Sequence, residues 1–176
     1  MKNWIIVEDR PWVMVGFIRD MKKKASELGE GIVEPEVLYY VSGDTGAQRK
    51  ATEISYKQKV DDFKNKTGIK VKKINKTNFY ENMEVYYKGG YIIFMDLNLT
   101  GSSAMYFNER INVQYAREKR KNAGEEKQIW FYTTGASLDA NFLSNEFWGN
   151  VIDVYSFEEG EAKLDLEKAW ELLGER

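Results

Sequence analysis

Apolar residues along the chain form short continuous runs that alternate with longer stretches of helical spacing. Continuous runs rich in β-branched and aromatic residues are typical of parallel strands covered on both faces. The run from Tyr91 to Met95 is the strongest of these and leads directly into Asp96. Strands of this kind are predicted at 4–7, 37–41, 91–95, 129–132 and 151–155. A lysine-interrupted segment at 69–74 predicts one more strand, near an edge of the sheet.

Stretches with apolar residues at helical spacing lie between these runs. Pro11 suits the first position of a helix that ends at Gly29, and Gly68 ends a second helix that begins near Ala47. Further helices are expected at 77–88, from about 102 to 115 with a charged end at 117–127, at 138–148 and at 162–173. Alternating strands and helices predict an α/β fold, a doubly wound parallel sheet between helices in a three-layer sandwich.

Composition narrows the chemistry that such a fold could carry. Histidine and cysteine are both absent among the 176 residues, which excludes histidine- or cysteine-based nucleophilic catalysis and thiolate or histidine metal sites. The formal charge of −2 gives no strong field toward nucleic acid or membrane surfaces. No stretch approaches the roughly 20 apolar residues of a membrane span. We expect a single cytoplasmic domain over 1–176, without direct nucleic-acid or membrane partners.

Acidic residues stand at the carboxyl ends of two predicted strands, which is the edge of the sheet where a ligand site would form. Glu8 and Asp9 end the first strand, and Asp96 ends the strand at 91–95. Ligands of open α/β sheets bind beyond the carboxyl ends of the strands, so these side chains can converge. Three carboxylates at one edge repel each other unless a cation neutralises them, and Mg²⁺ prefers such oxygen ligands. The sequence therefore predicts a magnesium site.

The order of these residues resembles the receiver domain of two-component response regulators. Three segments carry the likeness, namely Ile5-Ile6-Val7-Glu8-Asp9-Arg10-Pro11, Tyr91-Ile92-Ile93-Phe94-Met95-Asp96-Leu97-Asn98-Leu99-Thr100-Gly101 and Ile129-Trp130-Phe131-Tyr132-Thr133. The resemblance implies a flavodoxin/CheY-like fold in which Asp96 is the phosphoacceptor. It implies that Glu8, Asp9 and the backbone carbonyl of Asn98 join Asp96 in binding Mg²⁺, and that Thr133 contacts the phosphoryl group as a switch residue.

By the same likeness the partner is a histidine kinase or another signalling protein, and a homodimer is conceivable by analogy. The chain departs from the family in several places, and Thr134-Gly135 follows Thr133 where the family commonly has alanine. Tyr155 stands where the family places a lysine, Thr100 replaces the usual proline, and the span between the acid pair and Asp96 is about forty residues longer. The surplus is assigned to an inserted helix–strand–helix segment at about 43–88, and a smaller insertion lies near 117–127.

Other interpretations of the same residues remain open at this point. Glu8 and Asp9 could simply cap the helix that begins near Pro11, and Asp96 could cap a turn. The chain could be a pseudo-receiver that binds partners without phosphorylation. A Toprim-like, Mg²⁺-dependent phosphoryl-transfer domain also places a Glu after its first strand, but Asn98 stands where its second later acid would be. Whether the protein is an enzyme stays undecided, with a signalling or interaction domain favoured.

Overall fold

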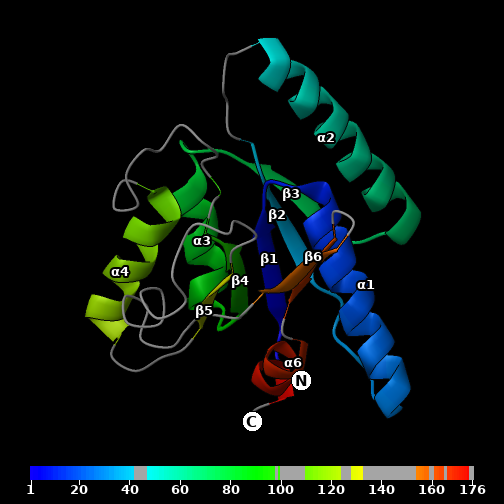
Figure 1. The fold of residues 1–176 in the computed structure, drawn as a ribbon. Coiled ribbons are helices and arrows are strands. Elements are labelled where there is room, and N and C mark those ends of the chain that lie inside the picture. Colours follow the sequence, from blue (N-terminus) through cyan, green and yellow to red (C-terminus); the bar gives the residue numbers. More distant parts are fainter. Residues whose placement is uncertain are drawn as a thin grey trace.

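The computed structural model describes eight parts of the chain. They are residues 1–41, 47–97, 99, 110–123, 128–132, 154–158, 161–164 and 166–174. Within them, a five-stranded sheet lies between two layers of helices (Figure 1). Its strands are β1 (Trp4–Glu8), β2 (Glu36–Tyr40), β3 (Val71–Ile74), β4 (Ile92–Asp96) and β5 (Ile129–Tyr132). All four pairings between neighbouring strands are parallel, which confirms the predicted α/β class and parallel sheet.

The strand order is β3-β2-β1-β4-β5, so the chain builds the sheet outward from β1 in two directions. It first adds β2 and β3 on one side, then crosses back and adds β4 and β5 on the other. Right-handed crossovers then place helices on opposite faces of the two halves. The helices are α1 (Pro11–Leu28), α2 (Ala47–Thr67), α3 (Phe79–Lys88), α4 (Ile111–Ala123) and α6 (Leu166–Gly174). Figure 1 shows α1 and α2 on one side of the sheet and α3 and α4 on the other.

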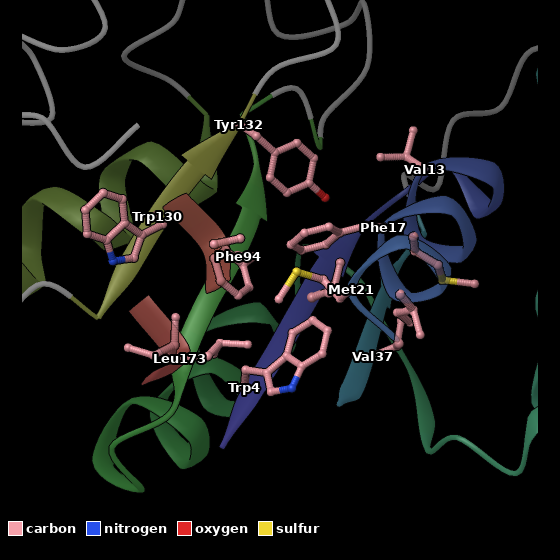
Figure 2. Packing of buried hydrophobic residues seen from close by; sticks show 14 of the residues in the cluster. Trp4, Val13, Phe17, Met21, Val37, Phe94, Trp130, Tyr132 and Leu173 are labelled. Carbon is pink, nitrogen blue, oxygen red and sulfur yellow. The ribbon is translucent and has the colours of Figure 1, made fainter. Parts of the chain in front are cut away.

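Two apolar clusters hold these layers together, one on each face. The first joins α1, α2 and α6 to the sheet and contains an aromatic triplet (Figure 2). In this triplet Trp4, Phe17 and Phe94 meet edge to face, with ring centroids 5.2–5.9 Å apart. The second cluster lies under α3 and α4. Strands buried on both faces explain why their sequences are continuously apolar rather than alternating.

The segment expected over 43–88 contains the predicted helix, strand and helix as α2, β3 and α3. As expected, β3 forms an edge of the sheet. Helix α1 ends at Gly29, whose positive φ of 69° allows its N–H and that of Glu30 to bond back to carbonyls of the last turn. The start of α1 also agrees with the prediction, since Pro11 is its first residue.

The carboxyl-terminal part differs from the prediction. Residues 161–164 form a strand, β7, and the last helix begins at Leu166 rather than near 162. β7 pairs antiparallel with β6 (Val154–Glu158), so the strand predicted at 151–155 overlaps a separate two-stranded sheet. The hairpin lies against α1 through β7. The helix expected at 138–148 and the start of the one expected near 102 fall outside the described residues.

Candidate functional site

The acidic residues lie where the direction of sheet building reverses. β1 and β4 are neighbours, and their last residues are Glu8 and Asp96. Asp9 follows Glu8 directly, and Tyr132 at the end of β5 pairs in register with Asp96. In doubly wound sheets this reversal opens a crevice beyond the strand ends, because the helices on its two sides cover opposite faces. The fold thus brings Glu8, Asp9 and Asp96 to the position that usually holds the ligand.

These three carboxylates are close together and shielded from water. Each offers an oxygen that lies within 4.8 Å of the others. Glu8 and Asp96 are completely buried, and the side chain of Asp9 is 19% exposed. Carboxylates gathered so tightly in a low-dielectric place repel strongly, so the groups around them decide how the cluster is tolerated.

Glu8 is held by three hydrogen bonds. Its Oε1 accepts the backbone N–H groups of Asp9 at 3.0 Å and Arg10 at 2.9 Å. Its Oε2 accepts the hydroxyl of Tyr132 at 2.7 Å. The bonded N–H groups precede α1, and Arg10 at the start of that helix has no side-chain cap. Glu8 therefore fixes the turn between β1 and α1 rather than capping the helix in the ordinary way.

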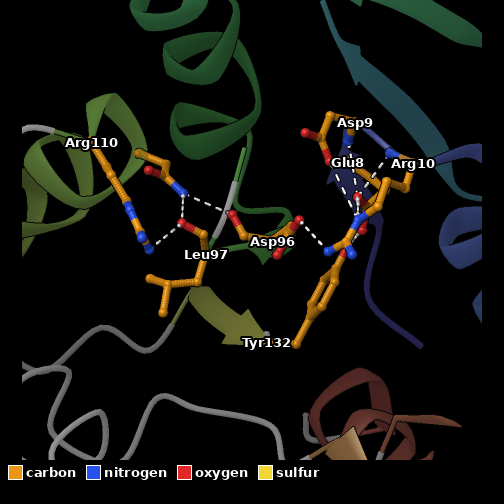
Figure 3. A network of polar contacts seen from close by, with 8 residues as sticks. Glu8, Asp9, Arg10, Asp96, Leu97, Arg110 and Tyr132 are labelled. Atoms are coloured by element: carbon orange, nitrogen blue, oxygen red, sulfur yellow. Dashed lines mark hydrogen bonds and ion pairs between the residues drawn. The ribbon is translucent and has the colours of Figure 1, made fainter. Parts of the chain in front are cut away.

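Arg10 places its guanidinium among the three acids (Figure 3). Its Nη2 donates to Oδ2 of Asp96 at 3.1 Å. Its Nε lies 3.7 Å from Oε1 of Glu8 and 3.7 Å from Oδ1 of Asp9. The buried Oδ1 of Asp9 accepts no hydrogen bond within the described part of the chain. Arg10 is thus a shared counter-ion, bonded closely to one carboxylate and loosely to two.

The chain just after Asp96 is fixed from the start of α4. The buried amide of Asn112 donates from Nδ2 to the carbonyl of Asp96 at 2.7 Å and to that of Leu97 at 3.2 Å. Arg110 donates from Nη1 to the carbonyl of Leu97 at 3.3 Å. These contacts anchor the backbone of β4 where it leaves the sheet, so Asp96 is held by α4 through its backbone and by Arg10 through its side chain.

Burial and like charge shift the protonation of the cluster. Burial, and then repulsion from Asp96, raise the pKa of Glu8 well above its usual value. The same two causes raise the pKa of Asp9 from 3.8 to about 7. Burial lowers the pKa of Arg10, but attraction to the carboxylates, with Asp96 first, outweighs it and raises that pKa. Arg10 therefore stays charged, and because one guanidinium does not offset three buried carboxylates, Glu8 and Asp9 keep their protons to a higher pH than usual.

The sequence identified part of this arrangement. Glu8, Asp9 and Asp96 converge as predicted. Asn98 and Thr133 lie outside the described residues, so their predicted roles as a carbonyl ligand and a phosphoryl contact stay predictions. Tyr155 belongs to β6 of the small antiparallel sheet, and its side chain is also outside the described part.

Sequence reasoning missed the two side chains that contact the carboxylates themselves, Arg10 and Tyr132. Tyr132 is the last residue of an apolar strand, and its buried hydroxyl gives no sign in the sequence that it faces an acid. Arg10 lies between an acid pair and a proline, where an arginine is easily taken for a solvated residue. A usable signal was the acid pair itself, because buried acids need a nearby donor or cation.

The donor set fits a hard divalent cation. Carboxylate oxygens are the ligands Mg²⁺ prefers, and oxygens around it at 2.0–2.1 Å lie roughly 3 to 4 Å from one another. Side chains whose oxygens lie within 4.8 Å need little movement to reach such spacing. The Oδ1 of Asp9 accepts no hydrogen bond among the described residues and meets only the loose contact from Nε of Arg10 at 3.7 Å, so it can offer a lone pair at the same place.

The fold and the site together define a doubly wound α/β protein with a buried acidic cluster at its switch point. Comparison of the chain with protein-family models, with curated proteins and with solved structures finds no match. In the described part of the chain, every helix is too short or too polar to cross a membrane.

Proposed function

We propose that the protein is a receiver-like signalling domain in which Asp96 accepts a phosphoryl group beside a bound Mg²⁺. One observation carries the proposal: Glu8, Asp9 and Asp96 each present a carboxylate oxygen within 4.8 Å of the others at the switch point. With β3 counted as an added edge strand, the order of the other four strands agrees with the 2-1-3-4 part of the flavodoxin/CheY-like order.

The proposed roles follow from position. Asp9, with the least buried carboxylate and an oxygen that accepts no hydrogen bond within the described residues, would be the main metal ligand. Glu8, fixed by Tyr132 and two backbone N–H groups, would supply a second oxygen or accept a hydrogen bond from metal-bound water. When bound, Mg²⁺ would screen the charge of the incoming phosphoryl group.

In the proposed chemical step the nucleophile is the carboxylate of Asp96. An oxygen of Asp96 attacks the phosphorus of the donor, a P–O or P–N bond breaks, and the leaving group departs with the electron pair and takes a proton. The product is an acyl phosphate on Asp96. The hydrogen bond from Asn112 to the backbone carbonyl of Asp96 supports the role of Asp96 as nucleophile, since it fixes the backbone that carries the reacting carboxylate.

The proposed donor is a histidine kinase or a related phosphorylated signalling protein. Because the chain lacks histidine, it cannot itself hold the phosphohistidine. The proposed output is a change in protein contacts, in which Thr133, the residue after Tyr132, would meet the new phosphoryl oxygens.

The test is incubation with Mg²⁺ and acetyl phosphate or phosphoramidate, followed by intact-mass measurement. We expect one added phosphoryl group in the wild type and none in Asp96→Asn. Asp62→Asn, which changes an exposed aspartate on α2, is the matched control and should label like the wild type. Labelling of Asp96→Asn, or no labelling of the wild type at any Mg²⁺ concentration, contradicts the proposal.

The contacts of Arg10 and Tyr132 favour a second candidate, the pseudo-receiver. Oδ2 of Asp96 is already bonded to Arg10, and Oε2 of Glu8 to Tyr132. A pocket satisfied by its own side chains could be purely structural, with partner binding elsewhere on the domain. No labelling together with no effect of Mg²⁺ on the fluorescence of the five tryptophans would favour this candidate.

A further inference from the structure

Access to the acidic site depends on Arg10. Asp96 is completely buried, and the guanidinium lies on the Oδ2 atom that would have to meet a cation or a phosphoryl donor. The same group lies 3.7 Å from oxygens of both Glu8 and Asp9. Whatever binds these carboxylates must therefore contend with a positive charge already in contact with all three.

A divalent ion and the guanidinium cannot both keep these contacts. Two cations within a few ångströms of each other repel, and in a largely buried place salt screens this repulsion much less than at the surface. The oxygens that would ligate the ion include those that Arg10 now contacts. An incoming ion must therefore break the bond to Asp96 and move Arg10 outward, and that cost is subtracted from the binding free energy.

The surroundings of Arg10 permit this movement. Its side chain is 24% exposed, whereas those of Glu8 and Asp96 are fully buried. Arg10 directly precedes α1, and its backbone is extended, with φ −115° and ψ 113°. The long side chain can thus turn toward solvent by rotation about its own bonds, while Pro11 keeps the start of the helix in place.

We propose that Arg10 is the affinity-determining residue of the site: it is the resident counter-ion of the three carboxylates, and a divalent cation binds by displacing it. The inference rests on the proposed function. It adds that the metal-free site is held closed by the chain itself, and that release of Arg10 also uncovers Oδ2 of Asp96.

The experiment titrates the full-length protein with Mn²⁺ as the probe, by calorimetry and by electron paramagnetic resonance of the free ion. Arg10→Gln should bind Mn²⁺ at least about tenfold more tightly than the wild type, since the competing charge is gone while a polar side chain remains. Arg10→Lys keeps the charge but loses the planar fork, so it should fall between them. Arg19→Gln removes one positive charge from the exposed side of α1 and is the matched control, expected to bind like the wild type.

A second measurement, the melting temperature, keeps the test usable if Arg10→Gln folds poorly. If Arg10→Gln is unstable in chelator, Mn²⁺ should raise its melting temperature more than that of the wild type, because the ion replaces the missing counter-charge. Equal affinities, or weaker binding by Arg10→Gln, would overturn the inference and leave the proposed metal site standing. Failure of both proteins to bind Mn²⁺ would overturn the inference and the proposed function together.

Discussion

Two tyrosine–glutamate pairs in this protein have the same hydrogen bond and opposite electrostatics. At the sheet edge, the hydroxyl of Tyr132 donates to Glu8 at 2.7 Å. Between α3 and α4, the hydroxyl of Tyr115 donates to Glu84 at 2.9 Å. Glu8 is buried beside two more carboxylates, whereas the side chain of Glu84 is 28% exposed and meets the ammonium groups of two lysines.

The pKa shifts of the two glutamates have opposite signs. Burial and repulsion raise the pKa of Glu8, while the hydrogen bond from Lys119 is the largest cause that lowers the pKa of Glu84. Lys119 also lies over the rings of Tyr87 and Tyr115, at 5.4 and 5.2 Å from their centroids. At Glu84 the hydrogen bond and the lysine contacts link α3 to α4 and neutralise the carboxylate. The pair at Glu8 belongs to a cluster with an excess of like charge, which is where a ligand is expected.

The largest expected difference is in pH dependence. With the pKa of Asp9 raised to about 7, the folded state binds more protons than the unfolded state between pH 4 and 7. The free energy of unfolding in chelator should therefore fall as pH rises from 4 to 7, by up to about 3 kcal/mol. Asp9→Asn should reduce this slope in urea-unfolding measurements, with the remaining slope coming from Glu8, whose pKa is also raised. A slope unchanged in the variant would mean that Asp9 does not carry the excess charge.

The second largest difference is expected in the stability lost when the hydroxyl of Tyr132 or of Tyr115 is removed. Tyr132→Phe keeps the buried ring but leaves Oε2 of Glu8 without its donor, which should cost about 2 kcal/mol. Tyr115→Phe removes the equivalent bond from a glutamate that water and lysines can still reach, so about 1 kcal/mol or less is expected. Chemical denaturation of both variants provides the comparison. Equal losses would show that the two pairs are energetically alike.

The smallest expected difference is in how salt changes the stability lost on replacing each glutamate. Glu84→Gln removes a half-buried carboxylate from two lysines and should lower stability by about 0.5 kcal/mol at low salt, with part of the loss gone at high salt. The matched change at the buried site, Glu8→Gln, should show no such salt dependence. Stability measured at low and high salt distinguishes the two variants. A salt-independent loss for Glu84→Gln would show that water and ions do not reach the contacts of Glu84 with the lysines.

The features that could be predicted from the sequence are those that a local pattern of apolar and polar residues determines. Strands buried on both faces leave continuous apolar runs, so four of the five parallel strands could be placed to within a residue or two. The acids at their ends followed from the rule that parallel strands end at one edge. The edge position of β3 followed from the lysines that interrupt it.

The features that could not be predicted, the terminal hairpin and the partners of the acids, depend on contacts between segments distant in the sequence. Residues 161–164 are Glu-Ala-Lys-Leu, all good helix formers, and their pairing with β6 overrides that local preference. Tyr132 is 124 positions from Glu8 in the chain, and Arg10 is 86 from Asp96. A pattern read locally predicts that an acid needs a partner, but not which side chain arrives from across the sheet.

The central position of β1 also has a consequence for how the protein folds. β1 meets β2 early in the sequence, but its other neighbour, β4, arrives only after β3 and α3 have been made. Closing so long a loop loses chain entropy before any contact compensates for it. We therefore expect the pairing of β1 with β4 to be a late event, so the acidic cluster is assembled near the end of folding. Its mutual repulsion would then slow that final docking, and a divalent cation present during refolding would speed it.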